Sequence, residues 1–163
     1  MTKFQAQSAG RDDTPTVSSS PSRPLHHRFG SLCLVFIGGA AGTSSREALS
    51  LFFSSSGTFP MTIFFINIAG AFLLGVLLES LSRSGKDQGW RQRSRLMIGT
   101  GYLGGFTTYS TLATDSALLL TKGMTNTMLV YALGTVLVGA VATFLGILCG
   151  SKIANTKGIR EAK

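Results

Sequence analysis

The sequence predicts an all-α integral membrane protein with four transmembrane helices, the third of them broken. Hydrophobic residues make up 44% of the 163 residues and charged residues only 13%, with a mean hydropathy of +0.31. A soluble domain carries about 25% charged residues. Four apolar segments each approach the ~20 residues that a helix needs to cross the hydrocarbon core. The basic residues lie almost entirely outside these segments, which indicates membrane topology rather than a nucleic-acid surface.

The segments divide the chain into three parts. Residues 1–28 are rich in Ser, Pro, Thr and charge, and we expect a disordered N-terminal tail because this composition buries too little apolar surface. Residues 29–150 form the transmembrane domain, and residues 151–163 form a basic C-terminal tail. The predicted spans cover residues 29–53, 61–81, 96–120 and 127–150.

Small residues recur at helix-packing spacing in the first and fourth spans. Gly38 and Gly42 form a G-x-x-x-G pattern. The fourth span contains two ladders of small residues, Thr135-Gly139-Thr143 and Ala142-Gly146-Gly150. Such faces let helix backbones approach closely in lipid, so we expect tight packing there, within the chain or against a partner subunit.

The third span has an unusual centre. Gly104-Gly105 and Thr107-Thr108 combine weak helix formers with hydroxyls that compete for backbone carbonyls. We therefore expect an unwound turn between Gly104 and Thr107. Irregular backbone at membrane depth is tolerated only where protein or a water-filled cavity surrounds it. Freed carbonyls can bind a small cation, and the nearby hydroxyls can donate to an anion.

Few polar groups lie inside the other spans, and each is costly there. Asn67 stands between apolar neighbours in the second span. It either makes an interhelical hydrogen bond or offers its amide to a ligand. Arg46 and Glu47 lie near the end of the first span, and one interpretation is that they form an ion pair.

Three motifs resemble those of one known family. They are G-G-A-A-G-T-S-S-R at 38–46, I-N-I-A-G-A-F-L-L-G at 66–75 and G-T-G-Y-L-G-G-F-T-T-Y-S-T at 99–111. The chain is similar to the CrcB/Fluc family of fluoride channels over roughly residues 30–150. The resemblance implies an antiparallel dimer with two narrow fluoride pores and one structural sodium ion at its centre, where the broken third helices meet.

The resemblance also implies roles for single residues. The backbone carbonyls of Gly104 and Thr107 would bind the sodium ion, and Arg46 would be the structural arginine of the first helix. The residues implied for the fluoride path are Asn67, Thr108, Tyr109, Ser110, Leu112, Tyr131 and Thr135.

Two positions depart from the family pattern. The third-helix motif of the family typically reads T-T-F-S-T-F, and its two phenylalanines line the pores. This chain has Tyr109 and Leu112 there. Tyrosine keeps an aromatic edge with its partial positive charge, whereas leucine has none. This difference puts in doubt whether every pore to which the chain contributes conducts.

We expect a channel subunit that lets toxic fluoride leave the cytoplasm passively, and not an enzyme. The alternative is a small four-helix proton-coupled transporter, which needs a central carboxylate. Its candidates, Glu47, Glu79 and Asp115, lie toward span ends. An intramembrane enzyme is disfavoured because no histidine falls in a span.

Charge predicts orientation and partner. All basic residues except Arg46 and Lys122 lie in the two tails and in the connection between the second and third spans. Loops rich in Lys and Arg stay in the cytoplasm, so both termini are expected on the cytoplasmic side of the plasma membrane. An antiparallel dimer needs both orientations. We therefore expect a second homologous subunit whose basic residues favour the opposite orientation. The alternative is a dual-topology homodimer, in which this chain is inserted in both orientations. Fluoride and membrane lipid are the other expected partners.

Overall fold

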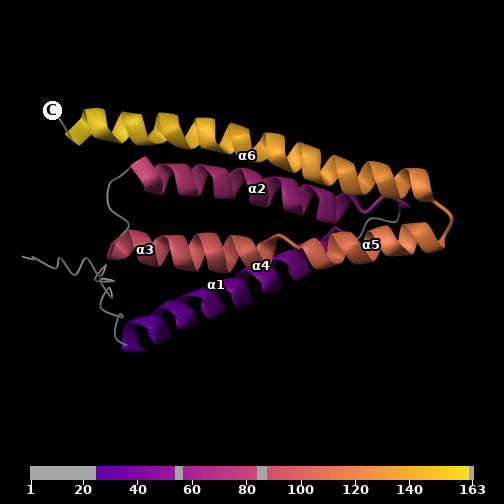
Figure 1. The fold of residues 1–163 in the computed structure, drawn as a ribbon, viewed down its shortest axis with the longest axis horizontal. Coiled ribbons are helices and arrows are strands. Elements are labelled where there is room, and N and C mark those ends of the chain that lie inside the picture. Colours follow the sequence, from indigo (N-terminus) through magenta and orange to yellow (C-terminus); the bar gives the residue numbers. More distant parts are fainter. Residues whose placement is uncertain (1–24, 54–56, 84–87, 162–163) are drawn as a thin grey trace, which may run out of the picture.

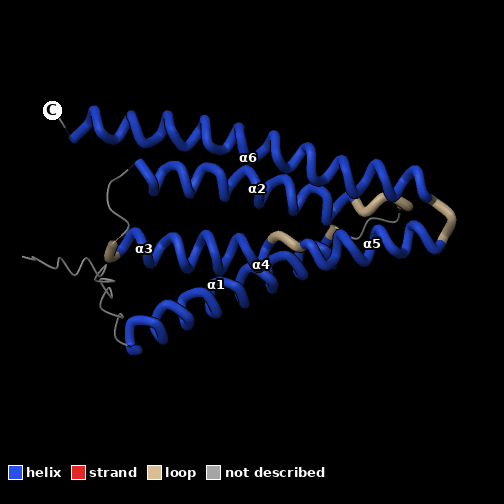
Figure 2. Tube along the Cα trace, in the orientation of Figure 1, coloured by secondary structure: helices blue, strands red, loops and turns tan. Residues whose placement is uncertain are grey.

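The computed structural model of the protein describes residues 25–53, 57–83 and 88–161, and all the regular structure in these ranges is helical (Figures 1 and 2). Most of the predicted N-terminal tail, residues 1–24, lies outside the described residues. The elements in chain order are α1 (Leu25–Phe52), α2 (Met61–Arg83), α3 (Trp90–Ser94), η1 (Arg95–Leu103), α4 (Gly104–Phe106), α5 (Tyr109–Thr121) and α6 (Thr125–Glu161).

These elements form four helical segments that lie side by side (Figure 1). Segments α1, α2, α3 to α5, and α6 alternate in direction along the chain. As a result, α2 and α6 run in the same direction and pack together. Helix α1 runs in the same direction as η1 and α4 and crosses them at an angle. The prediction of four helical segments is confirmed for the described residues.

The outer helices extend further than predicted. Helix α1 begins at Leu25, within the residues expected to belong to the tail. Helix α6 continues to Glu161, so most of the expected C-terminal tail is helical. Proline is absent from residues 151–161, so no proline interrupts the helix there. Helix α2 begins directly after Pro60, whose carbonyl accepts a hydrogen bond from the Phe64 amide over 3.1 Å.

Glycines allow the parallel pairs to pack backbone against backbone. A Cβ atom added at Gly38 would collide with the Met97 carbonyl, and one at Gly42 with the Tyr102 carbonyl. The prediction that the G-x-x-x-G pattern of the first span packs tightly is therefore confirmed, within the chain itself.

The pair of α2 and α6 is built in the same way. A Cβ atom at Gly146 would collide with the Phe72 carbonyl, and one at Gly150 would lie 2.7 Å from the Val76 carbonyl. Two members of the Ala142 ladder thus face α2.

The third segment changes its helical form and its packing partner along its length. Residues 95–103 are wound as a π-helix, a form that is rare at this length. The chain is extended at Thr107 (φ −76°, ψ 151°) and Thr108 (φ −144°, ψ 118°). Before this interruption η1 and α4 pack on α1, and after it α5 packs on α6.

Gly104 and Gly105 are helical, whereas unwinding was expected to include them. A Cβ atom at Gly105 would collide with the Gly39 carbonyl, so this glycine serves close packing against α1.

The apolar core is small. Leu112, Leu119 and Tyr131 are buried together, and four partly buried side chains pack against them: Phe59, Phe64, Met124 and Met128. Most other large apolar side chains are exposed, including many along α6. Helices α2 and α6 are long and apolar enough to cross a membrane. Extensive exposed apolar surface is what a lipid environment requires.

Candidate functional site

The site is centred on the interruption in the third segment, where Asn67 of α2 meets Thr108. The Asn67 Nδ2 atom donates to the Thr108 carbonyl oxygen over 3.2 Å, and the Thr108 amide donates to Asn67 Oδ1 over 2.8 Å. Asn67 is half-buried and Thr108 is buried. The lone carboxamide of the second span therefore makes interhelical hydrogen bonds, and it makes them to backbone atoms at the interruption.

At least two backbone carbonyls lose their helical partners at this point. In a continuous α-helix, the Thr108 amide would bond to the Gly104 carbonyl and the Thr111 amide to the Thr107 carbonyl. Instead, the Thr108 amide bonds to Asn67, and the Thr111 amide bonds to Thr108 Oγ1 over 3.1 Å. Gly104 and Thr107 are the residues whose carbonyls were predicted to bind sodium.

Hydroxyl groups gather around the N-terminus of α5. Thr108 is its N-cap residue, and its Oγ1 atom lies 3.1 Å from both Ser110 Oγ and Thr111 Oγ1. Thr107 turns its hydroxyl back to the Leu103 carbonyl over 2.9 Å. The site thus contains several small donors next to the amide of Asn67.

A second polar group lies between α5 and α6. The Tyr131 hydroxyl donates to Asp115 Oδ2 over 3.1 Å, and Thr135 Oγ1 donates to the Tyr131 carbonyl over 2.6 Å. Tyr131 is fully buried, and its ring makes an edge contact with Phe59 at 5.4 Å between centroids. Tyr131 and Thr135, both implied for the fluoride path, are buried there.

Other predicted site residues lie in different environments. Tyr109 is 81% exposed, whereas Leu112 is 7% exposed and belongs to the apolar core with Tyr131. Arg46 is half-buried on α1. The structure does not pair it with Glu47, which is exposed; the one ion pair found among the described residues joins Arg83 and Glu79.

Sequence reasoning assigned no site role to Asp115 and considered it only as a transporter carboxylate. The structure bonds it to Tyr131, sixteen residues further along the chain. An acidic residue in an apolar segment was the available signal, since such a residue is costly without a partner. Thr43 was also missed; its hydroxyl donates to the Gly105 carbonyl over 3.3 Å.

The described ranges contain no group of three His, Cys, Asp or Glu side chains that could hold a metal ion. The carbonyls of Gly104 and Thr107, released from helical bonding, are oxygen ligands of the kind that bind sodium at broken membrane helices.

Comparison with known proteins identifies relatives of this chain. Residues 33–147 match the family described as CrcB-like protein, Camphor Resistance (CrcB). A protein of Leifsonia xyli subsp. xyli named fluoride-specific ion channel FluC 2 is 42% identical over 88% of this chain and 99% of its own length. A FluC 2 of Bacillus cereus is 40% identical over 72% of this chain and 94% of its own length. A FluC 1 of Cutibacterium acnes is 40% identical over 70% of this chain and 80% of its own length.

Proposed function

The chain belongs to the CrcB-like family, and on that basis we propose that it is a subunit of a fluoride-specific channel in the cell membrane. It would let fluoride leave the cytoplasm passively. The observation that carries the proposal is the match of 42% identity over 88% of the chain to a protein named as such a channel. The family consists of ion channels and not of enzymes.

We propose that fluoride passes the amide of Asn67 and the hydroxyls at the start of α5. Fluoride is small and strongly hydrated, so a pore must replace its water with donors. One Nδ2 hydrogen of Asn67 bonds to the Thr108 carbonyl, and the amide carries a second one. Ser110 is exposed next to Thr108, and Tyr109 presents an exposed aromatic edge. Tyr131 and Thr135 would extend this polar path.

A structural sodium ion would be held by the carbonyls of Gly104 and Thr107. The diversion of the Thr108 and Thr111 amides to side chains supports this proposal, because it leaves both carbonyls without their helical donors. When bound, the ion would supply a fixed positive charge that lowers the cost of an anion nearby.

A second subunit would cover the polar face of the chain. Several polar or backbone-exposing residues of α1 and the third segment are exposed in the single chain: Thr43, Ser44, Glu47, Gly104, Ser110 and Thr114. The Thr43 and Thr114 hydroxyls already donate to carbonyls of this chain. Lipid offers the exposed groups no further hydrogen bonds, whereas another protein surface can. We propose an antiparallel dimer in which these faces meet.

The charge bias favours a heterodimer with both termini of this chain in the cytoplasm. Family members named FluC 1 and FluC 2 are compatible with paired subunits. A tag on the C-terminus, tested for accessibility from each side of the cell membrane, should be found inside only. An even split between the two sides, with full flux from the single chain, would favour the dual-topology homodimer.

Fluoride efflux from liposomes tests the proposed function. Vesicles loaded with potassium fluoride should release it when they contain this chain with its homologous partner, as followed with a fluoride electrode. Chloride-loaded vesicles and protein-free vesicles are the controls. Equal release of chloride, or no release with either subunit combination, would contradict a fluoride-specific channel.

A further inference from the structure

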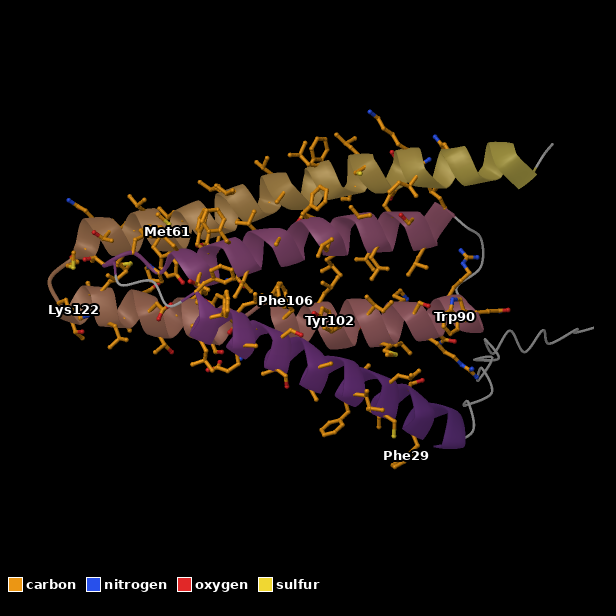
Figure 3. All side chains as sticks on the ribbon, turned by 180° about the vertical axis from the view of Figure 1, so that it is seen from behind. Phe29, Met61, Trp90, Tyr102, Phe106 and Lys122 are labelled. Carbon is orange, nitrogen blue, oxygen red and sulfur yellow. The ribbon has the colours of Figure 1, made fainter. Side chains whose placement is uncertain are left out.

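We propose that one end of the bundle binds the headgroups of anionic phospholipids. This is the end at which α2 and α6 end and α3 begins. The binding residues are Arg83, Trp90, Arg91, Arg93 and Lys152, called here the headgroup belt. Figure 3 shows Trp90 at one end of the bundle and Lys122 at the other. This inference concerns the lipid around the protein and does not depend on fluoride conduction.

Contacts between α2, α3 and α6 bring the belt to one depth. A Cβ atom at Gly150 of α6 would lie 3.0 Å from the Glu79 Cβ atom of α2. Lys152 and Leu81 each follow this contact by two residues in helices that run parallel, a displacement of about 3 Å. The Arg91 Nη2 atom of α3 donates to the Leu81 carbonyl over 2.6 Å. Lys152 therefore lies at about the same depth in the bundle as the turn of α2 that Arg91 contacts.

The belt presents cations and an indole at its surface. Trp90 is 79% exposed, and Arg93 and Lys152 are exposed. The Arg83 side chain is 48% exposed and pairs with Glu79. Glu79 is the one acidic side chain that the structure describes in α2, α3 and α6. By sequence, the four basic residues of the belt also outnumber Glu79 and Asp87 of the following connection, and such a positive excess attracts anionic headgroups at a membrane surface.

Neighbouring apolar surface favours a phospholipid over free phosphate. Leu148 and Ile153 of α6 are exposed within four residues of Lys152. Acyl chains would cover these side chains while the phosphate group meets the cations. An exposed tryptophan suits the same boundary, because its ring is apolar and its N–H is a donor.

The chain carries its own reporter for this test, since Trp90 is its only tryptophan. The purified full chain would be reconstituted into vesicles of phosphatidylcholine and phosphatidylglycerol in which only one of the two lipids is brominated. Bromine quenches indole fluorescence at short range. The proposal predicts stronger quenching by brominated phosphatidylglycerol than by brominated phosphatidylcholine, and a preference that falls as salt is raised. Equal quenching by the two lipids would overturn it, as would a preference insensitive to salt.

Single substitutions locate the binding. Arg93→Gln and Lys152→Gln should each reduce the preference by up to about five-fold. Lys122→Gln, at the opposite end, is the matched control and should leave it unchanged. An equal loss in all three variants would overturn the assignment to the headgroup belt. Because the readout is fluorescence quenching, the test stands even if the reconstituted chain conducts no fluoride.

Discussion

Asn67 makes hydrogen bonds to both backbone polar groups of a single residue, Thr108. This geometry requires an extended residue, because an extended residue points its N–H and C=O to the same side, whereas a helical residue points them in opposite directions along the axis. The interruption and the asparagine therefore stabilise each other, and α2 is joined to the third segment at the point where that segment is unwound.

Removing the carboxamide should affect both flux and stability. Asn67→Ala deletes the donor and the acceptor that hold Thr108, so we expect fluoride flux to fall at least about ten-fold and unfolding to be easier by about 1–3 kcal/mol, at roughly 0.6–1.7 kcal/mol for each interhelical bond. Liposome efflux and thermal unfolding in detergent would measure the two effects. Undiminished flux through folded Asn67→Ala channels would contradict a pore role and leave the residue a purely structural one.

Leu112 should contribute mainly to packing. Its side chain is 7% exposed within the apolar core, so Leu112→Ala should lower the free energy of unfolding by about 2–5 kcal/mol through lost contacts and a cavity. Leu118→Ala is the matched control, because Leu118 lies on the same helix and is 52% exposed. Similar losses in both variants would show that the two positions are equally covered in the assembled protein.

The hydrogen bond between Tyr131 and Asp115 can be tested without disturbing the ring packing. Tyr131→Phe removes only the hydroxyl, and Asp115→Asn keeps an acceptor oxygen. A double-mutant cycle on thermal stability should give a coupling of about 0.6–2 kcal/mol. If fluoride follows the proposed path, Tyr131→Phe also lowers flux. A coupling near zero would mean that the two side chains do not interact in the assembled channel.

Close packing of α1 on the third segment should be intolerant of a single methyl group. Gly42→Ala places a Cβ atom against the Tyr102 carbonyl, and we expect a loss of about 1–3 kcal/mol in stability, measured as a lower midpoint of thermal unfolding. Gly30→Ala is the control, since nothing among the described residues lies within 4 Å of its added Cβ atom. Equal stability of the two variants would argue against this packing.

Sodium should stabilise the protein if the carbonyls of Gly104 and Thr107 bind it. Exchanging sodium for a large organic cation should lower the midpoint of thermal unfolding. Above the dissociation constant, each ten-fold rise in sodium should add about 1.4 kcal/mol of stability. Asn67→Ala should weaken this dependence, because it returns the Thr108 amide to solvent or to Gly104. A midpoint of thermal unfolding that does not change with sodium concentration would contradict the proposed sodium site.

Composition and spacing predicted the features that depend on neighbouring residues. The four apolar segments and the close contacts of Gly38 and Gly42 follow from local patterns, which the structure reproduces. The interruption was expected between Gly104 and Thr107, whereas the extended residues are Thr107 and Thr108. The extended Thr108 is bonded to Asn67, which lies 41 residues away, and propensity contains no information about such a contact.

Other features arise only in the folded chain. The π-helix of residues 95–103 contains Gly99 and Gly101, both buried against neighbouring helices, and no sequence pattern distinguishes its winding from an ordinary α-helix. The bond between Tyr131 and Asp115 needs the tight turn after α5. There Gly123 adopts φ +73°, and the Met124 amide bonds to the Leu119 carbonyl over 2.9 Å. The turn makes α5 and α6 antiparallel and brings the tyrosine to the carboxylate.

The change of packing partner at Thr107 and Thr108 has a consequence for how the chain opens. Residues before the interruption are protected by α1, and residues after it by α6, so the two stretches belong to different cooperative units even though they are adjacent in sequence. In hydrogen exchange, amides of η1 should exchange together with those of the facing part of α1, and amides of α5 with those at the start of α6. Because α2 contacts both units, the Asn67 amide is the junction through which loss of one unit would weaken the other.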